Sequence, residues 1–269
     1  MTTLVTGATG NTGRHVVREL LERGEKVRAL TRNPAAALRI LPSGVELAEG
    51  THTAPDALAA ALDGIDRLHV TVTAGLAEVG PELVRRAVDA GVRRITVVWG
   101  GAVGAAEEAI AASGVEWTRL EPQEFMSNTA TWADSIRAEG VVREPYDLPS
   151  ALVHEADIGA VAAVALLEDG HSGQVYNLTG PEALTPRERV AHLSRAIGRE
   201  IGFVTITHEQ AVDRLMATGV SRADADYVIG WYAAPPAVST TIDDTVERVT
   251  GRPARTFAHW VTENAHRFQ

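Results

Sequence analysis

Short apolar stretches alternate with amphipathic ones along the first half of the chain. Apolar, β-branched runs predict buried strands, and segments with apolar residues at helical spacing predict the helices between them. The predicted strands are residues 3–6, 27–31, 44–48, 67–73, 94–99 and 115–120. The predicted helices cover a segment from about residue 11 to Gly24 and residues 54–62, 80–90 and 105–113. This alternation predicts an α/β fold with a doubly wound parallel sheet, whose ligands bind at the carboxyl ends of the strands.

The pattern loosens after Pro122. It still predicts helices at residues 154–168, 209–218, 222–232 and 255–267, a helix that Thr185 caps, and strands at residues 174–178 and 201–206. We therefore expect a first domain over residues 1–130. Residues 131–269 are expected to form mostly a smaller C-terminal lobe, with some segments returning to the first domain.

A glycine-punctuated turn follows the first predicted strand. Gly7 permits a sharp turn, Gly10 lets the backbone approach a pyrophosphate, and Gly13 allows the next helix to pack closely on the strand. A phosphate at the start of that helix would meet backbone N–H groups and the positive end of the helix dipole. The sequence therefore predicts a Rossmann-type dinucleotide-binding domain.

The end of the second strand indicates which dinucleotide binds. An acidic residue there would bind both ribose hydroxyls of NAD, whereas an arginine suits the 2′-phosphate of NADP. Arg32 stands at this place, and residues 29–33 contain no acid. Its guanidinium offers a planar fork to phosphate oxygens, so we predict NADP(H).

Composition narrows the class of protein further. The 269 residues carry a net charge of −10, which gives no support to a nucleic-acid partner. The absence of cysteine excludes disulfides and thiolate metal sites. No signal peptide or long apolar segment is evident, so we expect a cytoplasmic protein that binds no membrane. We expect it to be a monomer or homodimer. His154 has no second metal ligand at a useful spacing, and no metal site is predicted.

Several motifs together resemble the NmrA-like, NAD(P)-binding branch of the atypical short-chain dehydrogenase/reductases. They are VTGATGNTG at 5–13, VRALTRNP at 27–34, DALAAALDGIDRL at 56–68, SGVEWTRLEPQEFMSN at 113–128 and the segment 154–167 followed by GQVYNLTGPEALT at 173–185. The resemblance covers most of the chain. It implies NADPH bound to the first domain and a C-terminal lobe that binds the substrate.

The resemblance also assigns residues to the cofactor. The pyrophosphate would be held by Gly7, Thr9, Gly10, Asn11 and Thr12, and the 2′-phosphate by Arg32. Thr73 and Pro122 would lie on the nicotinamide side. Trp99, at the end of the fifth strand, is a candidate to stack on the nicotinamide or on the substrate.

The chain departs from the short-chain reductases in its catalytic residues. Their Tyr-x-x-x-Lys pair, which protonates the forming alkoxide, should fall on the helix over residues 105–113, which contains neither residue. Lys26, in the second strand, is the only lysine of the chain. The catalytic residue is therefore unknown from the sequence.

We predict an NADPH-dependent reductase of a ketone or quinone that belongs to a bulky, aromatic metabolite. Its expected substrate-binding residues are Trp99, Gln123, Phe125, Met126, Trp231 and Tyr232. The alternative is a non-catalytic NADP(H) sensor that regulates a protein partner, because some members of the family do not turn over.

Overall fold

The computed structural model describes residues 1–71, 76–98 and 103–269. It divides into two compact units, each built from three segments of the chain. Unit 1 comprises Met1–Pro122, Glu155–Leu178 and Thr245–Arg252, and unit 2 comprises Gln123–His154, Thr179–Asp244 and Pro253–Gln269.

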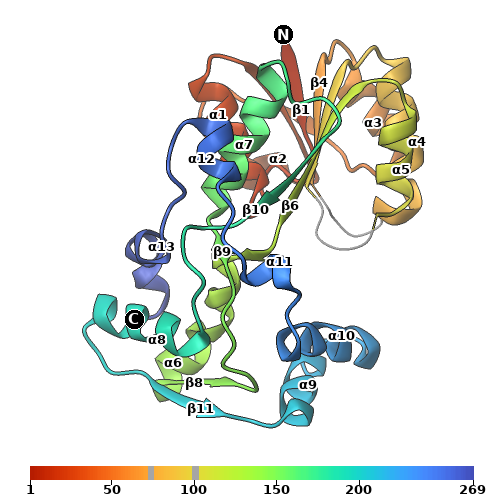
Figure 1. The fold of residues 1–269 in the computed structure, drawn as a ribbon. Helices are drawn as coiled ribbons and strands as arrows, with labels where there is room; N and C mark the ends of the chain where they lie inside the picture. The colour runs from red at the N-terminus through yellow and green to blue at the C-terminus, as the bar shows by residue number, and fades with distance from the viewer. Residues whose placement is uncertain (72–75, 99–102) are drawn as a thin grey trace. The chain divides into compact units, whose positions relative to one another are not determined.

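One parallel sheet organises unit 1 (Figure 1). Within the described residues it contains β1 (Thr2–Val5), β2 (Lys26–Thr31), β3 (Glu46–Glu49), β4 (Arg67–Thr71), β5 (Arg94–Val98), β6 (Glu116–Pro122) and β10 (Gln174–Leu178). The strands lie in the order β3-β2-β1-β4-β5-β6-β10, and all their pairings are parallel. The first six follow the Rossmann order, which reverses direction between β1 and β4. The predicted fold class is confirmed.

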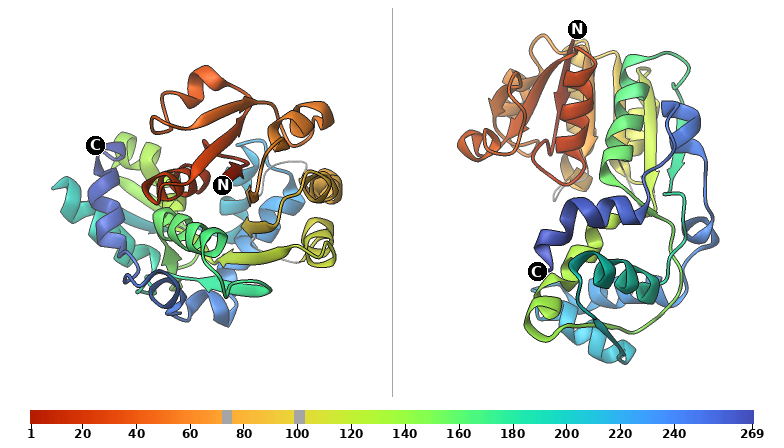
Figure 2. Two further views of the ribbon diagram at one scale, coloured as in Figure 1. Left: turned by 90° about the horizontal axis from the view of Figure 1, so that it is seen from above. Right: turned by 90° about the vertical axis from the view of Figure 1, so that its left-hand side faces the viewer.

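Helices cover both faces of this sheet (Figures 1 and 2). One face carries α1 (Gly13–Glu22), α7 (Glu155–Leu167) and α12 (Thr245–Thr250), and the other carries α3 (Pro55–Leu62), α4 (Leu76–Asp89) and α5 (Ala105–Ala112). The short α2 (Pro34–Ala37) follows β2. Helix α1 packs closely on α7 because Gly159 has no side chain: a Cβ there would lie 2.8 Å from the Cβ of His15.

The core of unit 1 reflects the apolar runs of the sequence. Leu4, Leu68 and Ile95 are completely buried on neighbouring strands. They share one apolar cluster with Leu62 of α3 and Leu83 of α4.

The helix predicted at residues 80–90 begins earlier, at Leu76, and continues through Pro81. The predicted start at Gly80 is therefore wrong. Gly80 is required by packing instead, because a Cβ there would lie 2.4 Å from the Cβ of Ala106 on α5.

Unit 2 is mainly helical. Its helices are η1 (Met126–Trp132), α6 (Ala133–Glu139), α8 (Pro186–Ile197), α9 (His208–Met216), α10 (Arg222–Ala233), α11 (Ala237–Thr240), α13 (Phe257–Asn264) and η2 (Ala265–Arg267). Its strands are β7 (Glu124–Phe125), β8 (Val141–Glu144), β9 (Leu152–Val153) and β11 (Gly202–Thr205), paired as β7–β9 and β8–β11. Its main core gathers Trp132, Leu152, Phe257, Trp260 and Phe268. No helix within the described ranges is both long and apolar enough to cross a bilayer.

Candidate functional site

The glycine-rich turn begins where β1 ends. The Thr6 hydroxyl donates a hydrogen bond to the carbonyl of His69 (3.2 Å) and accepts one from the N–H of Thr71 (3.0 Å). These bonds tie the end of β1 to the end of β4. Gly7 then adopts a φ of +59°, a left-handed conformation that costs glycine little. The chain thus leaves β1 where the strand order reverses, which is where ligands bind in this fold.

Gly7 and Gly13 leave no room for side chains. A Cβ at Gly13 would lie 2.2 Å from the carbonyl oxygen of Gly7, and one at Gly7 would lie 3.0 Å from the Cβ of Thr71. Gly10 is exposed, and its N–H donates to the Gly7 carbonyl at 2.9 Å. The turn is therefore a compact backbone cradle that a bound phosphate could approach directly.

The amino end of α1 opens onto this turn. Thr12 is the N-cap residue, but its side chain makes no capping hydrogen bond, and the first turn of α1 contains no acidic residue. Helix starts usually satisfy their N–H groups with such side chains. A helix start without them, beside a glycine cradle, suits a phosphate and so fits a dinucleotide.

Arg32 directly follows β2, the neighbour of β1, and is exposed. The loop after it is fixed by Asn33, whose side chain accepts a hydrogen bond from the N–H of Ala36 (2.9 Å) and caps α2. Since β1 and β2 are parallel, their carboxyl ends share one edge of the sheet. The structure thus brings Arg32 to the same edge as the glycine turn.

A buried histidine of β4 is hydrogen-bonded to the start of the turn. His69 of β4 is fully buried, and its Nδ1 lies 2.8 Å from the hydroxyl of Thr96 on β5. Burial lowers the pKa of His69 to about 3, so the ring is neutral at physiological pH. Its carbonyl accepts the hydrogen bond from the Thr6 hydroxyl described above, which links the core of the sheet to the turn.

Two expected cofactor residues, Thr73 and Trp99, lie outside the described residues. Pro122 is buried at the last position of β6, at the same edge as the glycine turn. The expected residues Thr9, Asn11 and Thr12 lie within the turn.

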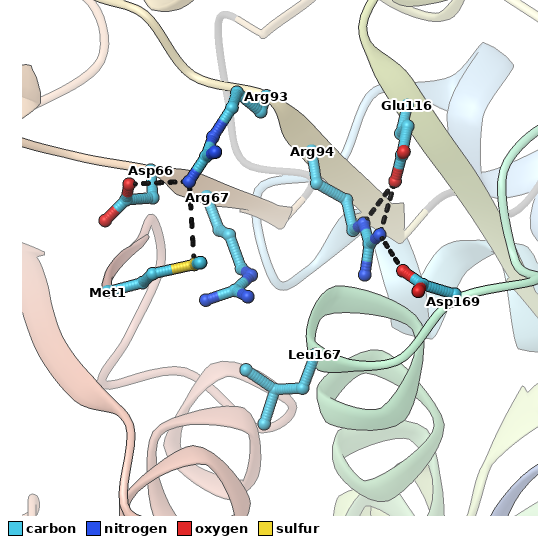
Figure 3. A pocket seen from close by; sticks show the side chains of 8 residues that line it. All are labelled: Met1, Asp66, Arg67, Arg93, Arg94, Glu116, Leu167 and Asp169. Atoms are coloured by element: carbon cyan, nitrogen blue, oxygen red, sulfur yellow. Dashed lines mark hydrogen bonds and ion pairs between the residues drawn. The ribbon is translucent and has the colours of Figure 1, made fainter.

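A pocket of about 200 Å³ lies at the opposite edge of the sheet, near the amino ends of β4, β5 and β6 (Figure 3). Its charges are paired: Arg93 binds Asp66 (3.0 Å), and Arg94 binds Glu116 (2.5 Å) and Asp169 (2.9 Å). Arg94 also donates to the carbonyl of Leu166 (3.1 Å) near the end of α7. The polar groups that line this pocket thus join the end of α7 to the sheet.

Unit 2 contains a buried ion pair. Arg189 of α8 and Glu124 of β7 are 4% exposed each. The guanidinium binds both carboxylate oxygens, at 2.9 and 3.1 Å, and donates to the carbonyl of Leu184 (3.2 Å). Two parallel hydrogen bonds make this the strong form of an arginine–carboxylate pair.

More polar groups surround this pair. Burial raises the pKa of the Tyr232 hydroxyl, with Glu124 adding to the effect, and the hydroxyl bonds to the side chain of Asn128. Burial also raises the pKa of Glu144, which accepts a hydrogen bond from the indole N–H of Trp132 (2.5 Å). We call Glu124, Asn128, Glu144, Arg189 and Tyr232 the lobe cluster.

The lobe cluster includes one residue expected to bind substrate, Tyr232, whose ring meets that of Trp231 edge to face, with 5.1 Å between centroids. Gln123 and Phe125 flank Glu124 and are half-buried, whereas Met126 is 1% exposed in the core. The other four cluster residues were missed by sequence reasoning. Nothing in the local sequence marks them, because they come together only through the fold.

Comparison with known proteins agrees with the geometry of unit 1. A family model described as NAD(P)H-binding matches residues 7–106. The chain is 37% identical to (4-alkanoyl-5-oxo-2,5-dihydrofuran-3-yl)methyl phosphate reductase of Streptomyces griseus, over 98% of both chains. It belongs to the NAD(P)H-binding family of oxidoreductases. It is also 36% identical to the NAD(P)H azoreductase of Xenophilus azovorans, again over 98% of both chains.

Solved structures of this oxidoreductase family share the fold. The NADPH-dependent quinone oxidoreductase of Escherichia coli, complexed with NADPH, superposes with a TM-score of 0.80 at 25% identity, over 97% of this chain and 99% of that one. The triphenylmethane reductase of Citrobacter superposes with a TM-score of 0.82 at 21% identity, over 99% of this chain and 100% of that one. The expected family, fold and enzyme class and an NAD(P)H cofactor are confirmed. The preference for NADP(H) and the individual site residues stay predictions.

Helix α5, where the Tyr-x-x-x-Lys pair of the short-chain reductases is expected, contains a buried acid. On α5, Glu107 is buried, and its carboxylate accepts a hydrogen bond from the N–H of Gly104 (3.0 Å). This acid caps its own helix.

The fold brings two possible metal ligands next to His154, which has none at a useful spacing in the sequence. His259 and Glu263 lie beside it, and the three side chains could together hold a metal ion. Their spacing of four residues on α13 was a usable signal, but nothing in the sequence linked α13 to His154.

Proposed function

We propose that this oxidoreductase transfers a hydride from NADPH to a ketone or quinone of a bulky, aromatic metabolite, without a Tyr-x-x-x-Lys pair. The observation that carries the proposal is the cradle of Gly7, Gly10 and Gly13 at the reversal of strand order, with Arg32 on the adjacent strand end. The cradle would hold the pyrophosphate and Arg32 the 2′-phosphate. The bound cofactor would supply a hydride from its nicotinamide ring.

The names of the relatives support a conjugated acceptor. They describe reductases of an alkanoyl-oxo-dihydrofuran phosphate, of azo compounds and of quinones. Each of these acceptors has a π system that spreads the negative charge arriving with the hydride. Such an acceptor needs less help from an enzymatic acid, whose loss typically costs about 10²–10⁴-fold in rate. The proton can then come from water or from the substrate.

The reaction is tested by following NADPH oxidation with a panel of quinones and polycyclic ketones. We expect turnover with at least one conjugated acceptor, yielding one hydroquinone or alcohol for each NADP⁺ formed. Tight NADPH binding without turnover of any acceptor would contradict the proposal and favour the sensor.

The role of Arg32 has its own test, the substitution Arg32→Ala. A charge-assisted hydrogen bond contributes about 1.5–3 kcal/mol, so we expect a loss of NADPH affinity of about 10- to 100-fold. NADH lacks the 2′-phosphate and should lose little. Arg18→Ala, at an exposed position of α1, is the matched control. An equal loss for both cofactors would contradict the assignment of the 2′-phosphate to Arg32.

A further inference from the structure

A histidine at the end of β9 faces a carboxylate of the C-terminal helix. His154 follows Val153 and is 2% exposed. Its Nε2 lies 3.1 Å from Oε2 of Glu263 on α13. More than one hundred residues separate the two in sequence (|i−j| = 109), so only the fold of unit 2 brings them together.

A second imidazole completes the group. His259 stands four residues before Glu263, and residues at this spacing share one face of a helix. The Nε2 of His259 lies 3.2 Å from Oε1 of Glu263, and its ring centroid lies 5.9 Å from that of His154. One coordinating atom from each of the three side chains can be chosen so that all lie within 4.8 Å of one another.

The backbone that carries these groups is fixed. Phe257, Trp260 and Val261 of α13 are buried in the core of unit 2. The Thr256 hydroxyl caps α13 by accepting a hydrogen bond from the N–H of His259 (3.2 Å). One ligand is thus buried, and the other two lie on an anchored helix with half-exposed side chains.

We propose that His154, His259 and Glu263 bind a divalent transition-metal ion of the zinc type. Imidazole and carboxylate are ordinary zinc ligands, with bonds of about 2.0–2.2 Å. Neighbouring ligands of a tetrahedral ion with such bonds lie about 3.3 Å apart. Glu263 Oε2 lies 3.1 Å from Nε2 of His154, and Glu263 Oε1 lies 3.2 Å from Nε2 of His259. Each imidazole is therefore at about this distance from a carboxylate oxygen, a different oxygen in each case.

The donor set also defines what the site rejects and what it leaves open. Two imidazole nitrogens disfavour Mg²⁺ and Ca²⁺, which prefer oxygen ligands. Three protein ligands leave a coordination position for water on the solvent side. The metal would connect the end of β9 to α13 and so stabilise unit 2.

The proposal is tested by titrating the full-length, tag-free protein with Zn²⁺ in a calorimeter, with Mg²⁺ as the comparison ion. We expect one zinc per chain and no Mg²⁺ binding. His259→Ala and Glu263→Gln should each lower zinc affinity by about tenfold or more, since even the outer partners of metal ligands contribute 10- to 100-fold. His266→Ala, at another exposed histidine, should change nothing. Absence of zinc binding, or binding that both ligand variants retain, would overturn the proposal.

A second measurement separates a site from loose surface binding. Because zinc would bind only the folded arrangement, it should raise Tm of the wild type and of His266→Ala, but not that of His259→Ala. His154 is buried, and its substitution endangers folding, so the test relies on the two exposed ligands. An equal Tm rise in His259→Ala would overturn the site.

Discussion

The glycine turn of unit 1 and the lobe cluster of unit 2 differ in which polar groups they present and whether these groups are paired. The turn presents main-chain groups at a strand end and lacks side-chain caps at the start of α1. The lobe cluster buries the charges of Glu124 and Arg189 and pairs them with each other. The turn depends on the absence of side chains, whereas the lobe cluster depends on the presence of particular ones. Substitutions should therefore affect ligand binding in the first region and folding stability in the second.

The largest expected effect is on stability, from Arg189→Met in the lobe cluster. Removing one partner of a buried ion pair leaves the other charge unpaired, which costs about 3–5 kcal/mol. We expect this loss in the free energy of unfolding, measured with urea near pH 7.

Arg222→Met is the matched control for that experiment. Arg222 also binds a carboxylate with two hydrogen bonds, both 2.8 Å, to Glu209, but the pair is exposed. Exposed pairs contribute about 0–1 kcal/mol. Losses of similar size in the two variants would show that burial of the lobe cluster does not matter.

The next effect is on binding, from Gly13→Ala in the glycine turn. The new Cβ would lie 2.2 Å from the Gly7 carbonyl oxygen, so the turn and α1 must separate. Such overpacking costs about 1–3 kcal/mol. If the cradle carries this cost, NADPH affinity should fall about 10- to 100-fold in a fluorescence titration.

Gly230→Ala tests whether any added methyl group has this effect. Gly230 lies within α10, and a Cβ there would meet nothing within 4 Å. Alanine is preferred over glycine in a helix by up to about 1 kcal/mol. The control should therefore keep its NADPH affinity and gain slightly in stability. Unchanged NADPH binding in Gly13→Ala would remove the glycine turn from the cofactor site.

The two regions also differ in how far the sequence predicts them. Gly7, Gly10, Gly13 and Arg32 follow strands whose apolar runs are visible in the sequence, so their common edge can be inferred. The lobe cluster joins residues from β7, η1, β8, α8 and α10, and no local pattern connects these elements. Gly80 shows a further limit, because a glycine required by helix packing looks like a helix boundary when its partner Ala106 is unknown.

The third effect is a dependence of folding stability on pH. Its size over one pH unit is smaller than the loss expected from Arg189→Met. The pKa of His69 is lowered from 6.5 to about 3 in the folded protein, so the unfolded chain binds the proton more readily. Stability from this group is present above pH 6.5 and is lost as the pH falls toward 3. Between pH 6 and 5 we expect a loss of about 1 kcal/mol from His69 alone.

His69→Asn isolates this contribution. The asparagine amide can replace Nδ1 in the bond to Thr96 but does not titrate. The variant should be less stable than the wild type at pH 7, and its stability should change less between pH 6 and 5 in urea denaturation. His266→Ala, which removes an exposed ring, should keep the wild-type slope. Equal slopes for His69→Asn and the wild type would mean that His69 does not titrate on unfolding.

The smallest effect is expected from Tyr232→Phe, which removes one hydroxyl from the lobe cluster. Burial raises the pKa of Tyr232, so the hydroxyl stays protonated and can donate a hydrogen bond but cannot act as an ionised base. Losing its bond to Asn128 should cost about 0.5–1.5 kcal/mol of stability.

If Tyr232 contacts the acceptor, as predicted from the sequence, KM for an aromatic ketone or quinone should rise less than tenfold, with kcat and NADPH affinity nearly unchanged. A fall in kcat of about 10²–10⁴-fold would instead make Tyr232 the missing proton donor. The lobe cluster would then take part in catalysis, whereas the glycine turn would serve to bind the cofactor.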